Sequence, residues 1–380
     1  MTNLKYIPRF QTKNLLHLLA PGKAIILYGP RRCGKTTLLR HLQEELKAKF
    51  LYLSGEDIET QAILSSQSVE KLKDLAGSNE VLVIDEAQKV PNIGLNLKLI
   101  VDHIPHVKVI ATGSSAFDLA RQTGEPLTGR KFTVKLYPLA QSEIGVYENP
   151  AQTAGNLESR LIFGSYPEVV VNRDRDFQIQ YLKEIVASYL YRDILELEGV
   201  RHADKLVRIL QMLVFQIGKD VSLNEIATAV GLSKNTVERY LDLLQKAFVL
   251  VRVQGFSRNL RKEIAKNARY YFYDLGVRNA LINNFNPLSL RDDTGMLWEN
   301  YIVIERMKNQ ERQGMAANNF FWRTYDRKEI DWVEERDGAI FGYEIKWGPK
   351  TVKAPVSFTE TYPQARYEVI NQDNYLRFIC

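Results

Sequence analysis

The stretch that decides the fold is YGPRRCGKTT at residues 28–37. Two glycines separated by four residues are followed by a lysine and two threonines. A glycine-rich turn that opens a helix presents several backbone N–H groups to one anion, and glycine permits the close approach that a side chain would block. We therefore predict a loop that binds the phosphates of a nucleotide. The residues expected to contact the nucleotide are Gly29, Pro30, Arg31, Arg32, Cys33, Gly34, Lys35, Thr36 and Thr37.

The flanking sequence favours this interpretation over a chance glycine-rich turn. Residues 24–28 form a short apolar run, which is typical of a buried parallel strand, and leucines recur at helical spacing after the loop. In this setting Lys35 is expected to reach the β- and γ-phosphates, and the Thr36 hydroxyl is expected to bind Mg²⁺. Cys33 is expected to be a passive filler whose exposure could make nucleotide binding sensitive to alkylation.

A second motif, VLVIDE at residues 81–86, places two carboxylates directly after a buried strand. Such a strand carries its last residue to the edge of the sheet where the phosphates bind. We expect Asp85 to hold Mg²⁺, directly or through water, and Glu86 to orient and polarise the attacking water. An ordinary acidic turn is the alternative, and the pairing with the loop disfavours it.

The next predicted strand, within residues 107–115, ends in hydroxyl side chains. Thr112 and Ser114 are our candidates for a residue that senses the γ-phosphate. Helix capping by Ser114 or Ser115 explains the same residues equally well.

An arginine precedes the fifth predicted strand, residues 132–137. Arg130 could stabilise charge on the transferring phosphate, either in its own subunit or from a neighbouring one, and Arg121 is the weaker candidate. A solvent-exposed basic turn is an even alternative for Arg130.

Composition restricts the class of protein. A chain of 380 residues should hold two or three domains, and two cysteines cannot form a disulfide framework, which fits a reducing cytoplasm. The first residues lack the apolar core of a signal peptide, and no apolar run approaches membrane-spanning length. The net charge is +6, and residues 201–272 alone carry 13 Lys and Arg against 6 Asp and Glu. This excess predicts an anionic partner, with DNA the first candidate.

The basic segment also has the order of a helix-turn-helix. One apolar-periodic helix is followed by a second that opens at Ser222, a turn at Gly231, and a third helix capped by Ser233. Two strands follow, at residues 248–253 and 268–272, so we predict a winged helix. The residues expected to reach DNA bases are Lys234, Asn235, Thr236 and Arg239, and the basic residues expected in the wing loop are Arg258, Arg261, Lys262 and Lys266. Packing of this element against protein is the alternative.

The last 87 residues, 294–380, are predicted to form a helix and then alternating strands. Asp331, Glu344 and Lys346 should converge on one face, because residues two apart in a strand share a side, and Glu299 on the helix could join them. Two carboxylates and a lysine suit metal-assisted phosphodiester cleavage, with Glu299, Asp331 and Glu344 as metal ligands and Lys346 steadying charge. Charged residues alternate on many exposed strands, but here they lie in apolar strands, where unpaired charge is costly.

Taken together, the chain resembles the bacterial and archaeal AAA-type P-loop ATPases, close to the archaeal ATPase and STAND groups, that carry a C-terminal domain of unknown function resembling PD-(D/E)XK nucleases. The matching motifs span nearly the full length of the chain and are specific when they are taken together. It comprises residues 29–36, 84–88, 112–115, 129–130, 164–168, 191–193, 271–274, 298–300, 329–331 and 344–346. The resemblance implies ATP binding, a winged helix and a nuclease-like C-terminal fold. Pro349, soon after Lys346, departs from the pattern and would end that strand.

We therefore expect an α/β multidomain protein with a P-loop parallel-sheet ATPase core (1–140), a helical lid (141–200), a winged helix-turn-helix (201–275) and a restriction-endonuclease-like α/β domain (276–380). The leading hypothesis is an ATP- and Mg²⁺-dependent hydrolytic switch that binds DNA and carries a nuclease-like domain. The alternative is a regulatory ATPase whose C-terminal domain is a non-catalytic docking or oligomerisation module. A cytoplasmic protein without a membrane partner is expected, and a homo-oligomer is compatible with this architecture.

Overall fold

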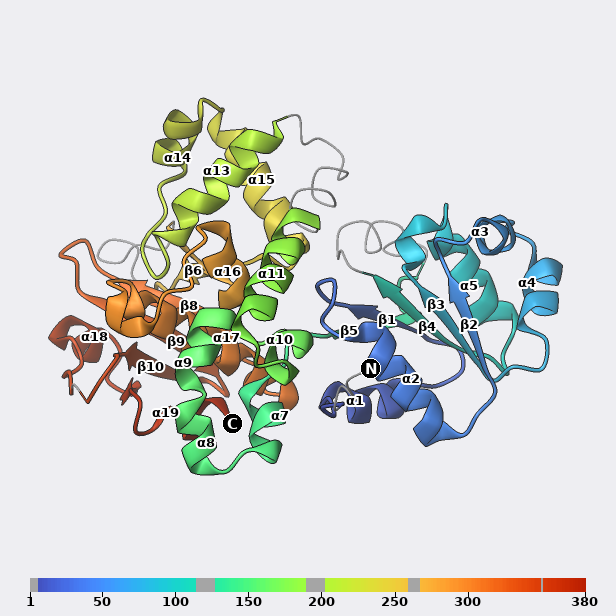
Figure 1. The fold of residues 1–380 in the computed structure, drawn as a ribbon, viewed down its shortest axis with the longest axis horizontal. Helices are drawn as coiled ribbons and strands as arrows, with labels where there is room; N and C mark the ends of the chain where they lie inside the picture. Colours follow the sequence, from blue (N-terminus) through green and yellow to red (C-terminus); the bar gives the residue numbers. More distant parts are fainter. Residues whose placement is uncertain (1–5, 114–126, 189–201, 259–266, 350) are drawn as a thin grey trace. The chain divides into compact units, whose positions relative to one another are not determined.

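The computed structural model describes residues 6–113, 127–188, 202–258, 267–349 and 351–380. The chain divides into two compact units (Figure 1). The N-terminal unit comprises Tyr6–Pro138 and Lys246–Phe248, and the C-terminal unit comprises Leu139–Gln245 and Val249–Cys380.

The N-terminal unit is built on a parallel five-stranded sheet of order β2-β3-β4-β1-β5. Its strands are β1 (Ala24–Tyr28), β2 (Phe50–Ser54), β3 (Val81–Asp85), β4 (Lys108–Gly113) and β5 (Lys131–Lys135). Its helices are α1 (Gln11–Leu18), α2 (Lys35–Leu46), α3 (Ile58–Leu64), α4 (Val69–Ala76) and α5 (Ile93–His103), with a 3₁₀ turn η1 (Ala87–Lys89). All five residues of β1 are buried, as its continuous apolar run predicts. The leucines of α1 and α2 pack against β1, β3 and β4 and form the core on that side of the sheet.

The C-terminal unit begins with short helices in the segment that we expected to be helical. They are α7 (Gln141–Ile144), η2 (Gly145–Tyr147), α8 (Pro150–Gly155), α9 (Leu157–Phe163), α10 (Pro167–Val171) and α11 (Arg175–Ile185). The helix-turn-helix segment follows as α13 (Ala203–Val214), α14 (Leu223–Val230) and α15 (Lys234–Lys246). The Ser222 hydroxyl accepts a hydrogen bond from the Glu225 N–H, and the Ser233 hydroxyl accepts one from the Thr236 N–H, so both serines cap the helices after them. Gly231 ends α14 with φ of 62°, a left-handed conformation that favours glycine.

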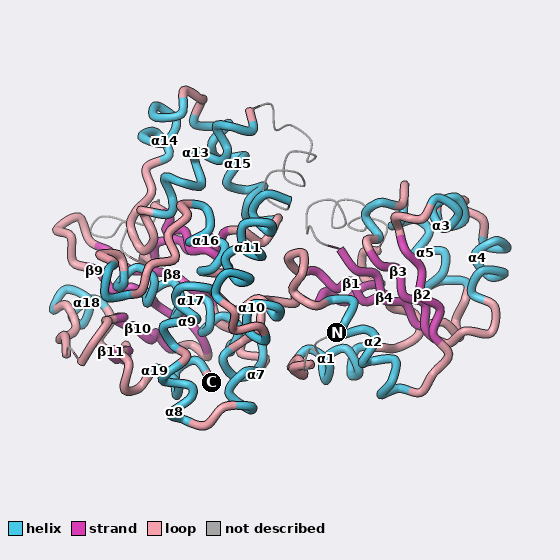
Figure 2. The backbone as a smooth tube through the Cα atoms, in the orientation of Figure 1, coloured by secondary structure: helices cyan, strands magenta, loops and turns pink. Residues whose placement is uncertain are grey.

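A six-stranded sheet of order β11-β10-β9-β8-β6-β7 forms the rest of this unit (Figure 2). Its strands are β6 (Leu250–Gly255), β7 (Ala268–Phe272), β8 (Asn318–Arg323), β9 (Glu329–Arg336), β10 (Ala339–Ile345) and β11 (Arg366–Ile370). Its helices are α16 (Leu275–Leu281), η4 (Leu288–Leu290), α17 (Thr294–Arg312), α18 (Val356–Thr361) and α19 (Tyr375–Ile379).

The two strands expected as a wing belong to this larger sheet. β6 and β7 form an antiparallel hairpin, and β6 also pairs in parallel with β8, with Gln254 opposite Phe320 and Gly255 opposite Phe321. The sheet therefore continues across the domain boundary that we placed after residue 275.

Three stretches that carry the family resemblance meet beside this sheet. The Asp274 carboxylate caps α16 and also accepts the Ser165 N–H at 2.7 Å. Gly164 is required there, because a Cβ at this position would lie 2.1 Å from an Asp274 carboxylate oxygen. The Asn300 side chain accepts the Phe272 N–H and donates to the Phe272 carbonyl. These residues therefore fasten the lid segment and α17 to the end of β7.

None of the helices in the described ranges is both long and apolar enough to cross a membrane.

Candidate functional site

The glycine-rich loop joins β1 to α2 at the carboxyl edge of the parallel sheet. Gly34 is the N-cap of α2 and has φ of 98°, which a side chain would strain. A Cβ on Gly29 would lie 2.2 Å from the Leu136 carbonyl oxygen, so the loop can pass beneath the end of β5 only with glycine there. Both glycines of the motif are therefore explained by the backbone path as well as by phosphate approach.

Lys35 is buried and folds back over the loop. Its ammonium donates to the carbonyl oxygens of Gly29 at 2.8 Å and Pro30 at 3.1 Å. Both acceptors are neutral, so a phosphate in the loop would offer the ammonium a charged acceptor, and charge-assisted hydrogen bonds are about twice as strong as neutral ones.

Thr36, Asp85 and Thr112 form a hydrogen-bonded chain across three elements. The Thr36 hydroxyl donates to one Asp85 carboxylate oxygen at 2.8 Å, and the Thr112 hydroxyl donates to the other. A hydroxyl in contact with a carboxylate beside a phosphate loop is an oxygen donor set that fits Mg²⁺. Thr36 and Asp85 would hold the ion, which would neutralise charge on the phosphates. Thr112, a predicted γ-phosphate sensor, here orients Asp85 and accepts the Glu86 N–H at 3.2 Å.

Glu86 follows β3 with φ of 48°, a left-handed conformation that is uncommon outside glycine. Gly55 permits this turn, because a Cβ there would lie 2.4 Å from the Glu86 carbonyl oxygen. The Gln88 amide donates to the Glu86 carboxylate at 2.5 Å. The sequence reasoning gave Gln88 no role, and its position two residues after the acid was the signal that could have identified it.

Cys33 does not have the exposure that we expected. Its side chain is fully buried in the core of α1, α2 and the sheet, and burial raises the pKa of its thiol. Arg9, which the sequence analysis overlooked, donates to the Cys33 carbonyl at 2.8 Å and to the Tyr137 carbonyl at 2.6 Å. The prediction of an exposed, alkylation-sensitive thiol is therefore wrong. Ser114, Ser115 and Arg121 lie outside the described residues.

Arg130 lies at the opposite edge of the sheet from the phosphate loop. Lys131 pairs with Ala24, the first residue of β1, whereas the loop begins after Tyr28. Strands rise about 3.3 Å per residue, so roughly 16 Å of β1 separates the two positions. The Arg130 guanidinium pairs with Asp102 at 2.6 Å. This position does not fit action on a phosphate of the same subunit, and action on a neighbouring subunit stays a prediction.

In the C-terminal unit, the structure brings Asp331, Glu344 and Lys346 together. Tyr343 pairs with Trp332, so Asp331 on β9 and Glu344 on β10 are next to each other across the antiparallel pair. The Lys346 ammonium lies 2.6 Å from a Glu344 oxygen and 3.5 Å from an Asp331 oxygen. Asp331 also accepts the Ile345 N–H at 2.9 Å. The catalytic role assigned to these three residues stays a prediction.

Arg269 on β7 completes this cluster, and sequence reasoning missed it because β7 was assigned to a wing. Only 1% of its side chain is exposed. Its guanidinium lies 3.7 Å from Asp331 and 4.0 Å from Glu299, and it pairs with Glu329 at 2.7 Å and with Asp220 at 3.4 Å. No local signal in the sequence of β7 identifies this role, because it depends on the pairing of β7 with β6 and of β6 with the distant strand β8.

Burial and mutual repulsion act on the acids of this cluster. Burial, with the Asp331 charge, raises the pKa of Glu299 to about 8 and the pKa of Glu344 to about 7. The Tyr271 hydroxyl donates to Glu299 at 2.8 Å. Two cations, Arg269 and Lys346, lie against these acids, and no three His, Cys, Asp or Glu residues of the described ranges form a metal-binding group.

The face expected to contact DNA is partly described. Lys234, Asn235 and Arg239 are exposed on α15, Thr236 is half-buried, and Val237 and Tyr240 face the core. The Arg258 guanidinium, expected in the wing loop, pairs with Glu335. Arg261, Lys262 and Lys266 lie outside the described residues.

Comparison with known proteins agrees with the N-terminal geometry. Residues 21–145 match the family model described as an AAA domain. Residues 154–288 and 294–378 match two further models, each described as a domain of unknown function (DUF8612 and DUF4143).

Relatives align over most of the chain. An uncharacterized protein of Mycobacterium tuberculosis is 27% identical over 338 residues, spanning 87% of this chain and 72% of that protein. An uncharacterized protein of Methanocaldococcus jannaschii is 24% identical over 335 residues, spanning 83% and 73%. Among solved structures, the Walker-type ATPase PABY2304 of Pyrococcus abyssi has a TM-score of 0.51 at 18% identity, over 73% of this chain and 96% of that chain. At this identity the last likeness shows a shared fold.

Proposed function

Because the chain belongs to the bacterial and archaeal AAA-type P-loop ATPases, we propose that it is a Mg²⁺-dependent ATP-hydrolysing switch that binds DNA through α15 and whose carboxylate cluster is a non-catalytic ion-pair network. ATP hydrolysis follows from the family, whereas DNA binding through α15 and the non-catalytic role of the cluster are proposed. The observation that carries it is the position of Arg269 between Glu299 and Asp331.

In the N-terminal unit, each proposed role follows from a contact. The loop amides and Lys35 would hold the phosphates, while Asp85 keeps its orientation through Thr112. Glu86 would accept a proton from the attacking water, and the Gln88 amide would hold its carboxylate in place. The left-handed turn at Glu86 means that the position of its carboxylate depends on the backbone at the end of β3. Small changes in that backbone should therefore alter the rate of ATP hydrolysis more than the affinity for ATP.

DNA binding by α15 is supported by charge and by exposure. Residues 201–272 carry the charge excess of the chain, and Lys234, Asn235 and Arg239 are exposed on one helix. A helix in the major groove makes base contacts through its first turns, and these residues lie in the first two turns of α15.

The carboxylate cluster is better suited to stabilise the unit than to cleave a phosphodiester. Arg269 and Lys346 together contact Glu299, Asp331 and Glu344, so two fixed positive charges already lie where a metal ion would be needed. Nuclease activity is the second candidate, and the Glu344 oxygen that has no hydrogen-bond partner in the described part of the chain favours it.

The test compares the wild type and four variants in three assays: ATP hydrolysis, DNA affinity and DNA nicking. ATP hydrolysis is measured with and without DNA for wild type and for Lys35→Ala, which should lose the activity. DNA affinity is measured over a salt series for Arg239→Gln and for the control Lys183→Gln, an exposed charge on α11. Because Arg239 is expected to contact a base, Arg239→Gln should bind DNA more weakly than Lys183→Gln, and the affinity of all these proteins should fall with salt by about 0.9 log units for each phosphate neutralised. A DNA affinity that is independent of salt would contradict DNA binding, and nicking that requires Mg²⁺ or Mn²⁺ and is lost in Asp331→Ala would establish the nuclease instead.

A further inference from the structure

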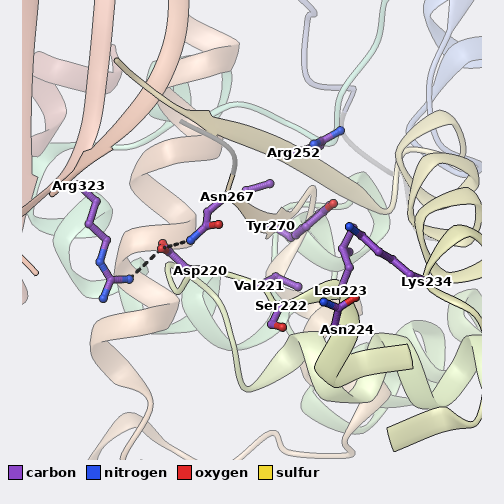
Figure 3. Close-up of a pocket in the computed structure, with 11 residues that line it drawn as sticks. Asp220, Val221, Ser222, Leu223, Asn224, Lys234, Arg252, Asn267, Tyr270 and Arg323 are labelled. Atoms are coloured by element: carbon purple, nitrogen blue, oxygen red, sulfur yellow. Dashed lines mark hydrogen bonds and ion pairs between the residues drawn. The ribbon is translucent and has the colours of Figure 1, made fainter. Parts of the chain in front are cut away.

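A cavity of about 560 Å³ lies in the C-terminal unit, beside the carboxylate cluster, and shares Lys234 with the exposed face of α15 (Figure 3). Its walls come from the start of α14, the start of α15, the β6–β7 hairpin and the end of β8. The cavity therefore lies where the helix-turn-helix segment adjoins the large sheet.

The cavity is strongly basic. Lys234, Arg252 and Arg323 line it, and Asp220 is the one acidic residue in its lining. Both Asp220 oxygens already have partners: one contacts Arg269 at 3.4 Å, and the other contacts Arg323 at 2.9 Å and the Asn267 amide at 2.8 Å. The charges of Lys234 and Arg252 are consequently not balanced by the Asp220 carboxylate.

The hydroxyl of a largely buried tyrosine, Tyr270, points into the same space. Tyr270 is only 4% exposed and lines the cavity, and in the described ranges its hydroxyl makes no hydrogen bond with the protein. In Figure 3 the Tyr270 hydroxyl and the Lys234 amine point into the cavity from facing elements. The hydroxyl is therefore available to donate a hydrogen bond to a group bound in the cavity.

Two further groups at the cavity could donate hydrogen bonds to a bound anion. The Nε of Arg323 is buried and has no hydrogen-bond partner among the described residues. The first turn of α14, residues 223 and 224, lies in the cavity wall, and the N–H groups of a first turn carry partial positive charge. Burial raises the pKa of Tyr270 although the Arg252 charge opposes this, so the hydroxyl keeps its proton and remains a donor.

We propose that this cavity is a binding site for a phosphate group, held by Lys234, Arg252 and the Tyr270 hydroxyl. Every unpaired group named here donates hydrogen bonds or carries positive charge, which is what a phosphate requires. The phosphate could belong to a nucleic-acid backbone or to a free phosphorylated small molecule. The inference goes beyond the proposed function and does not require base contacts by α15.

The experiment uses the full chain loaded with Mg²⁺ and a non-hydrolysable ATP analogue, so that the N-terminal phosphate loop is already filled. Inorganic pyrophosphate is titrated by calorimetry, and a short DNA duplex is titrated by fluorescence anisotropy. The variants are Lys234→Gln, Arg252→Gln and Tyr270→Phe, and Lys183→Gln is the control that removes an exposed positive charge from the same unit.

We expect each lost charge to weaken binding about tenfold or more, and Tyr270→Phe to weaken it about three- to tenfold, while the control binds as wild type does. Losses with pyrophosphate alone would identify a free phosphorylated ligand, and losses with DNA that pyrophosphate competes away would identify the backbone. The proposal is overturned if neither probe binds, or if the three variants bind like the control. Since the DNA arm with Arg239→Gln tests α15 separately, the two proposals can fail independently.

Discussion

Replacing Arg269 by methionine tests how the carboxylate cluster is held together. Methionine keeps much of the volume but removes the guanidinium, which contacts Asp220, Glu299, Glu329 and Asp331. Breaking a buried ion pair by removing one partner costs about 3–5 kcal/mol. For a domain of this size, 1 kcal/mol lowers Tm by about 2–4 °C, so we expect Arg269→Met to unfold about 6–20 °C below wild type.

The loss of stability caused by Arg269→Met should depend on pH in a defined direction. The pKa of Glu299 is about 8 in the folded protein against an ordinary value of 4.5, so the folded state binds the proton more tightly than the unfolded state. Stability from this group is therefore present at low pH and is lost as the pH rises from about 4.5 to about 8. The Arg269 charge lowers this pKa, so its removal should raise the pKa further and make the destabilisation larger at pH 8 than at pH 6.

Thermal unfolding followed by circular dichroism at pH 6 and pH 8 measures both effects. The matched control is Arg377→Met, which breaks the exposed ion pair to Glu368, with side chains 79% and 41% exposed, and should cost no more than about 1 kcal/mol. If Arg269→Met shifts Tm no more than this control, equally at both pH values, the carboxylates do not depend on the guanidinium and the ion-pair network is refuted. A rise in the Tm of ATP-free Lys35→Ala protein on adding Mn²⁺ would point to a metal in the cluster instead.

Three further outcomes are expected for the N-terminal unit. Glu86→Gln should keep ATP binding but lower the hydrolysis rate about 10²–10⁴-fold, as loss of a general base does, and equal losses of binding and hydrolysis in calorimetry and phosphate-release assays would contradict this role. Arg130→Ala should leave hydrolysis by dilute protein within about twofold, because Arg130 pairs with Asp102 at the far edge of the sheet; a large loss that grows with protein concentration would place it in a neighbouring site. Cys33 should resist iodoacetamide in the native protein and react after unfolding, as mass spectrometry would show, and rapid native labelling would mean that the thiol is not buried.

The parallel ATPase sheet could be predicted well because its strands and its glycine-rich loop are marked by residues that are close together in the sequence. Apolar runs marked β1, β3 and β4, and the glycine-rich loop set the position of the nucleotide site next to Asp85. The helices after Ser222 and Ser233 were also predicted correctly, because each serine caps its helix through a contact only three residues away.

The remaining features depend on contacts between residues that are distant in the sequence. Nothing in the composition of β6 says that it pairs with β8, about 65 residues later, so the hairpin was read as a wing and Arg269 was overlooked. Burial of Cys33 likewise depends on α1 and the Arg9 contact, which the loop motif does not contain. Arg130 was placed near the phosphates by its position in the sequence, whereas the register of β5 against β1 puts it at the other edge.

The six-stranded sheet of the C-terminal unit also limits where the chain can be cut into fragments that fold. Because β6 and β7 lie beside β8, a fragment that ends near residue 275 would expose the β6 edge, and a fragment that starts there would expose the β8 edge. Open apolar strand edges promote aggregation, so neither half should be recovered as a soluble piece. In recombination between relatives, residues 139–380 should therefore be inherited as one block, and a crossover between the segments 154–288 and 294–378 should succeed only where both parents supply matching edges.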